Sequence, residues 1–322
     1  MKRNHHILLV IIATLALMAQ AVAAEGHFER NLTVTGETDL DVLTGAGSIS
    51  VVRGSAGNVH VNAHIKTTSG SDGLSAEQKV RMLESSPPIE QNGNAIRIGH
   101  ITDERLRRNV SISYEITVPE QTRARTQSGS GNEKIEGIRG PVRAASGSGN
   151  MEFRNIAAEV RTDTGSGHIQ ASDLRGGLVA NTGNGNIRAD AISGAFSGNT
   201  GNGDVQVNAS TLGDVRLQTG SGSIQVDQVK GALTAVTGSG DIDIRGTQTA
   251  SWKLQAGSGS IHVHLPSDAA FELNAHSGSG DIHTEHPLTT NANMRQGEMR
   301  GTVGGGGALL DVSTGSGNIQ IE

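Results

Sequence analysis

The sequence predicts an all-β fold, a single-stranded parallel β-solenoid with coils of about 18 residues. Three observations predict it: a Gly-x-Gly frame recurs at a nearly constant spacing, and two separate sets of apolar residues recur with it. A short fixed period indicates one small unit stacked on copies of itself. The regular frames begin at Gly129, Gly147, Gly165, Gly183, Gly201, Gly220, Gly238 and Gly257, and wider steps lead to Gly278 and Gly315.

Residues 1–24 are expected to be a signal peptide and not part of the fold. Lys2 and Arg3 precede an apolar run over residues 7–18 that is too short to span a membrane, and Ala23 and Ala24 supply small residues for cleavage. The mature chain would then be periplasmic or secreted; a retained N-terminal anchor is the alternative. The sequence contains no cysteine, so it offers neither a disulfide nor a lipid-acceptor cysteine. No later segment is apolar over the length that a transmembrane anchor needs.

The composition favours one elongated body and gives no sign of nucleic-acid binding. The formal net charge is −6 and the charges are mixed in sign, so the chain has no general attraction for nucleic acid. The 45 glycines and the scarcity of aromatic residues would suit a disordered chain. The regular placement of Ile, Val and Leu between the glycines argues against disorder.

The pattern of residues 25–125 predicts a less regular N-terminal β cap that contains one short helix. Residues 74–84 form the helical segment, because Val80 and Leu83 can share one side with Leu74, Ser75 can serve as the N-cap, and Pro87 would end the helix. The other segments alternate apolar and polar residues, as strands with one buried face do. These segments are 32–34, 48–52, 59–65, 96–98 and 110–118.

Residues 126–322 predict the solenoid coils. In one coil Ile187 and Ala189 alternate with polar residues along a strand, and Phe196 points inward from a second strand after a bend. We expect a right-handed coil from the usual crossover preference, with a left-handed coil as the competitor. The first inward set is Ile169, Ile187, Val205, Ile224, Ile242, Ile261 and Ile282, and the second is Val142, Val160, Leu178, Phe196, Val215, Leu233, Trp252 and Leu273. A hydroxyl ladder of Thr164, Thr182, Thr200, Thr219 and Thr237 is expected to bond turn amides.

The period breaks near the end of the chain. Residues 285–308 read as an insertion that contains Pro287 and a glycine run, and residues 309–322 restore one coil. Because the strand 319–321 comes at the end of the sequence, we expect it to leave an open hydrogen-bonding edge unless the insertion folds over it. Such an edge would suit self-association through the C-terminal edge strand.

We expect no catalytic or cofactor-binding residues. No helix follows a Gly-x-Gly frame, as nucleotide binding would require. Asp204, Asp241 and Asp281 follow such frames, as in calcium-binding β-rolls, but calcium needs several converging oxygens and these residues are isolated. Neither a carboxylate pair for glycoside hydrolysis nor a serine nucleophile with a matched histidine and aspartate stands out.

The strongest metal candidate is an outward ladder of Asp243, His262 and His283. In register, these residues would occupy one position on successive coils, ~4.8 Å apart. Two imidazoles and one carboxylate are few ligands for a zinc-type site, so a solvated ladder is the favoured interpretation.

Three motifs resemble the bacterial "putative adhesin" family of exported β-solenoid domains. They are the stretch Tyr114-Glu115-Ile116-Thr117-Val118-Pro119, the repeated Thr-Gly-Ser-Gly-Asp/Asn-Ile turns, and the glycine run 304–307 with the turn 314–319 after it. The resemblance covers nearly the whole mature chain and supplies no catalytic residues. It implies a non-enzymatic structural or binding module at the bacterial cell envelope, with an envelope or extracellular polysaccharide or protein as partner. A polysaccharide-active enzyme on the same scaffold and an envelope-stress accessory protein are the alternatives.

Overall fold

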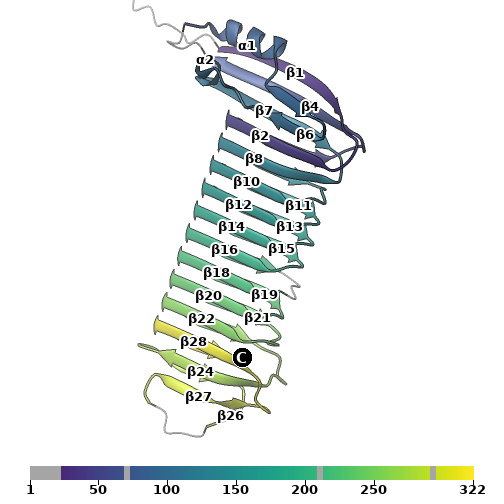
Figure 1. Ribbon diagram of the computed structural model, residues 1–322. Coiled ribbons are helices and arrows are strands. Elements are labelled where there is room, and N and C mark those ends of the chain that lie inside the picture. Colours follow the sequence, from purple (N-terminus) through teal and green to yellow (C-terminus); the bar gives the residue numbers. More distant parts are fainter. Residues whose placement is uncertain (1–22, 69–72, 209–212, 291–294) are drawn as a thin grey trace, which may run out of the picture.

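The computed structural model describes residues 23–68, 73–208, 213–290 and 295–322, so the expected signal peptide lies outside them except for its last two residues. The chain is all-β and forms a rod of stacked strands with a cap at one end (Figure 1). Two long sheets run the length of the rod, one of 14 strands and one of 15. The expected β-solenoid with parallel coils is therefore present.

The 14-stranded sheet contains the strand that follows each glycine turn. In spatial order it consists of β1 (Ala23–Thr33), β4 (Asn58–Thr68), β7 (Val110–Val118), β3 (Ile49–Arg53), β9 (Glu133–Glu136), β11 (Met151–Ile156), β13 (Ile169–Leu174), β15 (Ile187–Ile192), β17 (Val205–Asn208), β19 (Ile224–Val229), β21 (Ile242–Gly246), β23 (Ile261–His264), β29 (Ile319–Ile321) and β25 (Ile282–Thr284).

The 15-stranded sheet contains the strand that leads into each glycine turn. In spatial order it consists of β26 (Leu288–Thr289), β27 (Glu298–Val303), β24 (Phe271–Ser277), β28 (Ala308–Ser316), β22 (Trp252–Ser258), β20 (Leu233–Ser239), β18 (Val215–Ser221), β16 (Phe196–Asn202), β14 (Leu178–Asn184), β12 (Val160–Ser166), β10 (Val142–Ser148), β8 (Thr122–Ser130), β2 (Thr38–Ala46), β6 (Ala95–Ile98) and β5 (Ile89–Asn92).

The core lies between the two sheets, and both predicted inward sets line it. Ile169, Ile187 and Val205 pair directly across β13, β15 and β17, and all three are buried. Val160, Leu178 and Phe196 do the same across β12, β14 and β16, and the rest of both sets is buried except Ile282, which is half-buried. Each coil alone has too little apolar surface to form a core, so stacking supplies the burial that stabilises the rod.

The glycine turns owe their sequence to close contact between coils. Gly185, the second glycine of its frame, has φ +157°, and a Cβ added there would lie 2.1 Å from the carbonyl oxygen of Gly167 in the preceding coil. The threonine hydroxyls donate to these carbonyls: Thr182 Oγ1 to Gly167 at 3.0 Å and Thr200 Oγ1 to Gly185 at 2.9 Å. The prediction that the threonines bond turn amides is therefore wrong, because the turn presents carbonyl oxygens toward the threonine hydroxyl.

The N-terminal residues extend the same two sheets and do not form a separate core. β2 and β3 continue the parallel stacking onto β8 and β9, whereas β1, β4 and β7 pair antiparallel. The predicted helix is confirmed as α1 (Ala76–Ser85), which begins with a capping box between Ser75 and Gln78 and buries Val80 and Leu83. A second helix, α2 (Glu104–Arg107), was not predicted, because its single turn shows no apolar period.

The C-terminal coil lies inside the stack and not at its end. β28 lies between β22 and β24, and β29 lies between β23 and β25 (Figure 1). Within the insertion, β27 pairs antiparallel with β24 along one edge, so only the other edge of β24 is available to β28. The prediction of an open edge at the C-terminal strand is therefore wrong, and so is the prediction of self-association through that strand.

Candidate functional site

The predicted ladder of Asp243, His262 and His283 is interrupted. Asp243 and His262 are register partners, but the inserted strand β29 places Gln320 between His262 and His283. Asp243 also accepts a hydrogen bond from Arg245 at 3.4 Å between Oδ2 and Nη2. Within the described residues, no group of three histidine, cysteine or carboxylate side chains could hold a metal ion.

The aspartates that follow the glycine frames have a structural role. Asp204 Oδ1 accepts the backbone N–H of Ser223 at 2.9 Å, and Asp241 Oδ1 accepts that of Ser260 at 2.8 Å. The same bond recurs between other coils with Asn, His or Ser as acceptor, from Asn132 to Asn318. We call this series the amide ladder. Because each of these side chains accepts a hydrogen bond from the backbone of a neighbouring coil, the series connects the coils along the rod and is not a set of calcium ligands.

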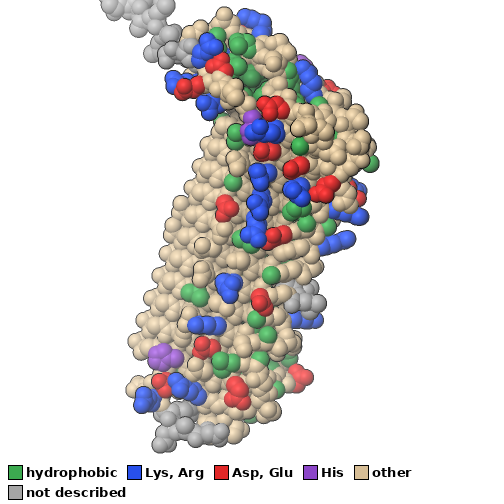
Figure 2. Space-filling model, viewed as in Figure 1, with side chains coloured by type: hydrophobic (Ala, Val, Ile, Leu, Met, Phe, Trp, Pro, Cys, Tyr) green, Lys and Arg blue, Asp and Glu red, His purple; other side chains and the backbone are tan. Residues whose placement is uncertain are grey.

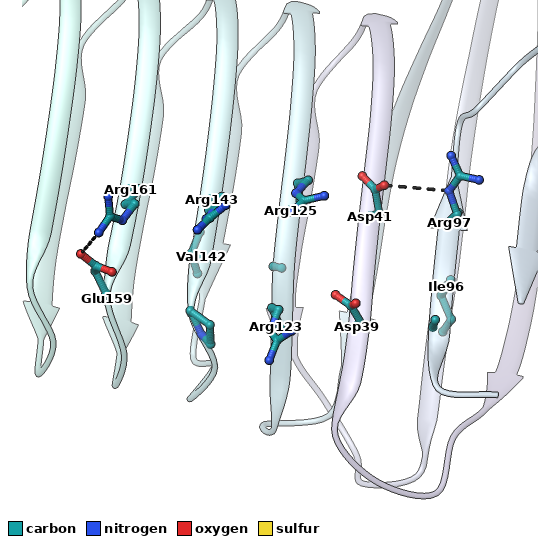
Figure 3. A pocket seen from close by; sticks show the side chains of 13 residues that line it. Asp39, Asp41, Ile96, Arg97, Arg123, Arg125, Val142, Arg143, Glu159 and Arg161 are labelled. Carbon is teal, nitrogen blue, oxygen red and sulfur yellow. Dashed lines mark hydrogen bonds and ion pairs between the residues drawn. The ribbon is translucent and has the colours of Figure 1, made fainter. Parts of the chain in front are cut away.

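A groove on the outer face of the 15-stranded sheet brings five arginines together. It encloses about 460 Å³ and is crossed by β6, β2, β8, β10 and the start of β12 (Figure 3). We call it the arginine groove. Its charged residues are five arginines, Arg97, Arg123, Arg125, Arg143 and Arg161, and three carboxylates, Asp39, Asp41 and Glu159.

The coil period builds the groove's central ladder. Arg125, Arg143 and Arg161 are direct register partners on β8, β10 and β12. Their neighbours along each strand point into the core, so alternation sends all three guanidinium groups to the same outer face. Adjacent arginines are thus one strand spacing apart, ~4.8 Å. Figure 2 shows the resulting row of Lys and Arg side chains over the upper half of the rod.

Two arginines of the ladder form no ion pair within the described residues. Arg161 pairs with Glu159 at 2.9 Å, and Arg97 pairs with Glu90 at 3.4 Å. Within the described part of the chain, Arg125 and Arg143 form no ion pair, although Asp41 is the register partner of Arg125. Asp41 lies instead 3.9 Å from Arg97 and 3.4 Å from His100. Like charges opposite one another on neighbouring strands repel, so an anion between Arg125 and Arg143 would stabilise both.

The charge thins out farther along the same row. The partners after Arg161 are Val179 and Ser197, and cations return singly at Arg216 and Lys253. A shallow channel runs beside the ladder along the bare glycine turns at Gly129, Gly147, Gly165 and Gly183. An extended chain could therefore lie along the rod next to the guanidinium groups.

One ionisable group lies inside the core near the groove. Glu133 on β9 takes the inward position between Ile49 and Met151 and is 1 % exposed. Thr126 Oγ1 donates to its Oε2, while Oε1 has no hydrogen-bond partner. Burial raises the pKa of Glu133 to about 7, against smaller lowering effects of the hydrogen bonds from Thr126 and the Ser128 backbone. The sequence signal was available, since Glu133 stands two residues after a glycine frame, where other coils have Ile, Val or Met.

Stacked parallel coils with hydrogen-bonded turns and a cationic outer ladder define a β-solenoid scaffold. The chain belongs to the Toastrack DUF4097 family, whose model matches residues 89–322. This match confirms the resemblance to that family inferred from the motifs. No helix in the described residues has the length and apolarity to cross a membrane.

Three solved structures match the chain at low sequence identity and low TM-score. A "putative cell adhesion protein" from Clostridium sporogenes is 12% identical, with 92% of this chain and 99% of that chain covered and a TM-score of 0.24. A "putative adhesin" from Bacteroides fragilis is 13% identical, with 92% and 97% covered and a TM-score of 0.33. A "putative lipid binding protein" from Parabacteroides distasonis is 12% identical, with 92% and 97% covered and a TM-score of 0.35. None of the curated proteins matches the sequence significantly.

Proposed function

We propose that this protein is an exported, non-enzymatic, adhesin-like binding module of the bacterial cell envelope. In this proposal the mature chain begins after cleavage near Ala23 or Ala24, residues 25–125 form the cap, and residues 126–322 form a right-handed solenoid of about 18 residues per coil. The arginine groove is the binding surface, and its partner is an anionic envelope or extracellular polymer. The sequence motifs that resemble the "putative adhesin" family support the adhesin-like class.

The observation that carries the proposal is the unpaired state of Arg125 and Arg143. Both lie on adjacent strands of a protein whose formal net charge is −6, so the local excess of positive charge opposes the charge of the whole chain. Exposed arginines usually gain little from single contacts, but a fixed row can bind several anionic groups at once. The planar guanidinium group suits carboxylate, sulfate and phosphate oxygens.

The regular spacing favours a polymer over a small anion. The ladder offers a guanidinium group every ~4.8 Å, so anionic groups on a sugar chain could meet every strand or every second strand. The glycine channel beside the ladder leaves room for the sugar rings. Binding would combine these contacts with little ordering cost, because the strands already hold the arginines in a row.

The test is retention of the mature protein on immobilised alginate, a polyuronate, with neutral dextran as the reference. We expect salt-sensitive retention on alginate and roughly tenfold weaker binding of an Arg125→Gln, Arg143→Gln variant. The matched control is Arg216→Gln with Lys253→Gln, which removes two cations from the same row outside the groove. Equal losses in the two variants would contradict the groove assignment. Release of reducing ends from alginate would contradict the non-enzymatic role.

A further inference from the structure

A second hollow lies beside the arginine groove, where the segment from Gly99 to Val110 folds over the outer face of β2. It encloses about 520 Å³, a volume in the range of small-molecule sites. Its walls are apolar and come from β2, the α2 segment and β7: Leu43, Ile101, Leu106, Val110 and Ile112. We call this hollow the cap pocket. Four of these side chains are only half-buried, so the pocket exposes apolar surface that a ligand could cover.

The floor of the cap pocket holds a polar atom without a partner. Tyr114 lines the pocket and is 1 % exposed, yet its hydroxyl has no hydrogen-bond partner. Burial raises the pKa of Tyr114, so the phenol stays protonated and can donate a hydrogen bond. Gly99 packs against this hydroxyl, because a Cβ there would lie 3.0 Å from Tyr114 Oη and 1.8 Å from the Leu43 carbonyl oxygen. A buried unpaired hydroxyl costs free energy, which a polar group of a ligand would recover.

The rim of the cap pocket is positive. Arg107 lines it, and no ion pair of Arg107 is formed within the described ranges. Arg97 lines both the cap pocket and the arginine groove, and Glu90, the carboxylate at the rim, is already paired with it. A ligand with an anionic head would therefore meet an available guanidinium group as its apolar part enters the hollow.

We propose that the cap pocket binds a single-chain fatty acid. The chain packs against Leu43, Leu106 and Val110, and the carboxylate pairs with Arg107 at the rim. The Tyr114 hydroxyl donates to an oxygen carried on the chain, so a hydroxylated fatty acid binds more tightly than the plain one. Arg125 and Arg143 do not line the cap pocket, so replacing them distinguishes binding in the arginine groove from binding in this pocket.

The test is isothermal titration of the full mature protein with dodecanoate, with hydroxydodecanoates that differ in hydroxyl position, and with dodecyltrimethylammonium. We expect dodecanoate to bind and the cationic amphiphile of equal chain length to bind at least tenfold more weakly. Arg107→Gln should weaken dodecanoate roughly tenfold. At least one hydroxydodecanoate should bind several-fold more tightly than dodecanoate, and Tyr114→Phe should remove that difference.

Two further variants separate this site from the groove and from unfolding. Val110→Trp fills the hollow from β7 and should abolish dodecanoate binding, while thermal unfolding shows whether the variant is folded. Arg125→Gln with Arg143→Gln should leave dodecanoate binding unchanged and lower only alginate retention. Absence of dodecanoate binding, equal binding of the cationic amphiphile, or undiminished binding by folded Arg107→Gln protein would overturn the proposal.

Discussion

At the scale of single residues, Glu133 makes the core sensitive to pH. Its carboxyl group replaces an aliphatic side chain in an inward set, and burial raises its pKa to about 7 from the ordinary 4.5. The folded state therefore binds a proton that the unfolded state releases between these values. Stability is highest below the unfolded pKa and falls as the pH rises through the folded pKa.

The replacement Glu133→Gln tests this dependence. At pH 8 the variant should be more stable than the wild type by an amount on the order of 3 kcal/mol. The reason is that folding the wild type at this pH requires either a charged Glu133 carboxylate in the core or the uptake of a proton, and both cost free energy. At pH 5 the two proteins should be similar. Urea unfolding at both pH values measures the difference. Glu136→Gln, on the outward side of the same strand, is the control. If this variant gains as much stability at pH 8 relative to pH 5 as Glu133→Gln does, Glu133 is not the source of the pH dependence.

At the scale of strands and turns, the amide ladder joins coil to coil outside the two sheets. Asn186 Oδ1 accepts the N–H of Asp204 at 2.9 Å, and other coils use Asp, Ser or His in the same place. What these residues share is a short side chain with an acceptor that reaches one strand spacing along the rod. This shared chemistry explains why the position tolerates both neutral and acidic residues.

The replacement Asn186→Ala should therefore lower the free energy of unfolding by about 1 kcal/mol, because the Asp204 amide loses its partner. Asn186→Asp should change it by much less, since Asp204 and Asp241 accept the same bond elsewhere. Gln170→Ala on the exposed face of β13 is the control and should have almost no effect. Chemical denaturation of the four proteins compares them; a loss in Asn186→Asp as large as in Asn186→Ala would exclude the hydrogen-bond explanation.

The sequence was sufficient for the features that depend on the repeated local pattern. The glycine period, the two inward sets and the capped helix after Ser75 all follow from turn chemistry and alternation, and all are present. The spacing of Arg125, Arg143 and Arg161 was equally visible, but which arginines lack a carboxylate depends on side-chain geometry. The position of residues 309–322 could not be predicted, because their strands have the same local pattern whichever coil they pair with.

At the scale of the whole molecule, the coil of β28 and β29 joins the two coils on either side of it. Leu310 packs in register between Trp252 and Leu273, and all three are buried. Deleting residues 309–322 would remove β28 and β29 and leave β22 to β25 without the strands between them.

We expect this deletion to lower the thermal unfolding temperature and to raise amide hydrogen exchange in residues 252–284, while β10 to β16 keep their protection. The reason is that two rows of backbone groups and one apolar layer lose their partners. Deleting only Glu322 is the control. Unchanged exchange in residues 252–284 would mean that β24 and β25 re-pair directly with β22 and β23, and that the inserted coil adds no stability.

The place of the last coil also determines the order in which the rod can be completed. On a chain that is synthesised from its N-terminus, coils from β8 onward can add one after another as each appears, because their partners already exist. The coil of β24 and β25 is different, since the strands it pairs with in parallel, β28 and β29, are made after it. Docking of this coil must therefore wait for residues 308–321, so a product truncated before them cannot reach the native topology there.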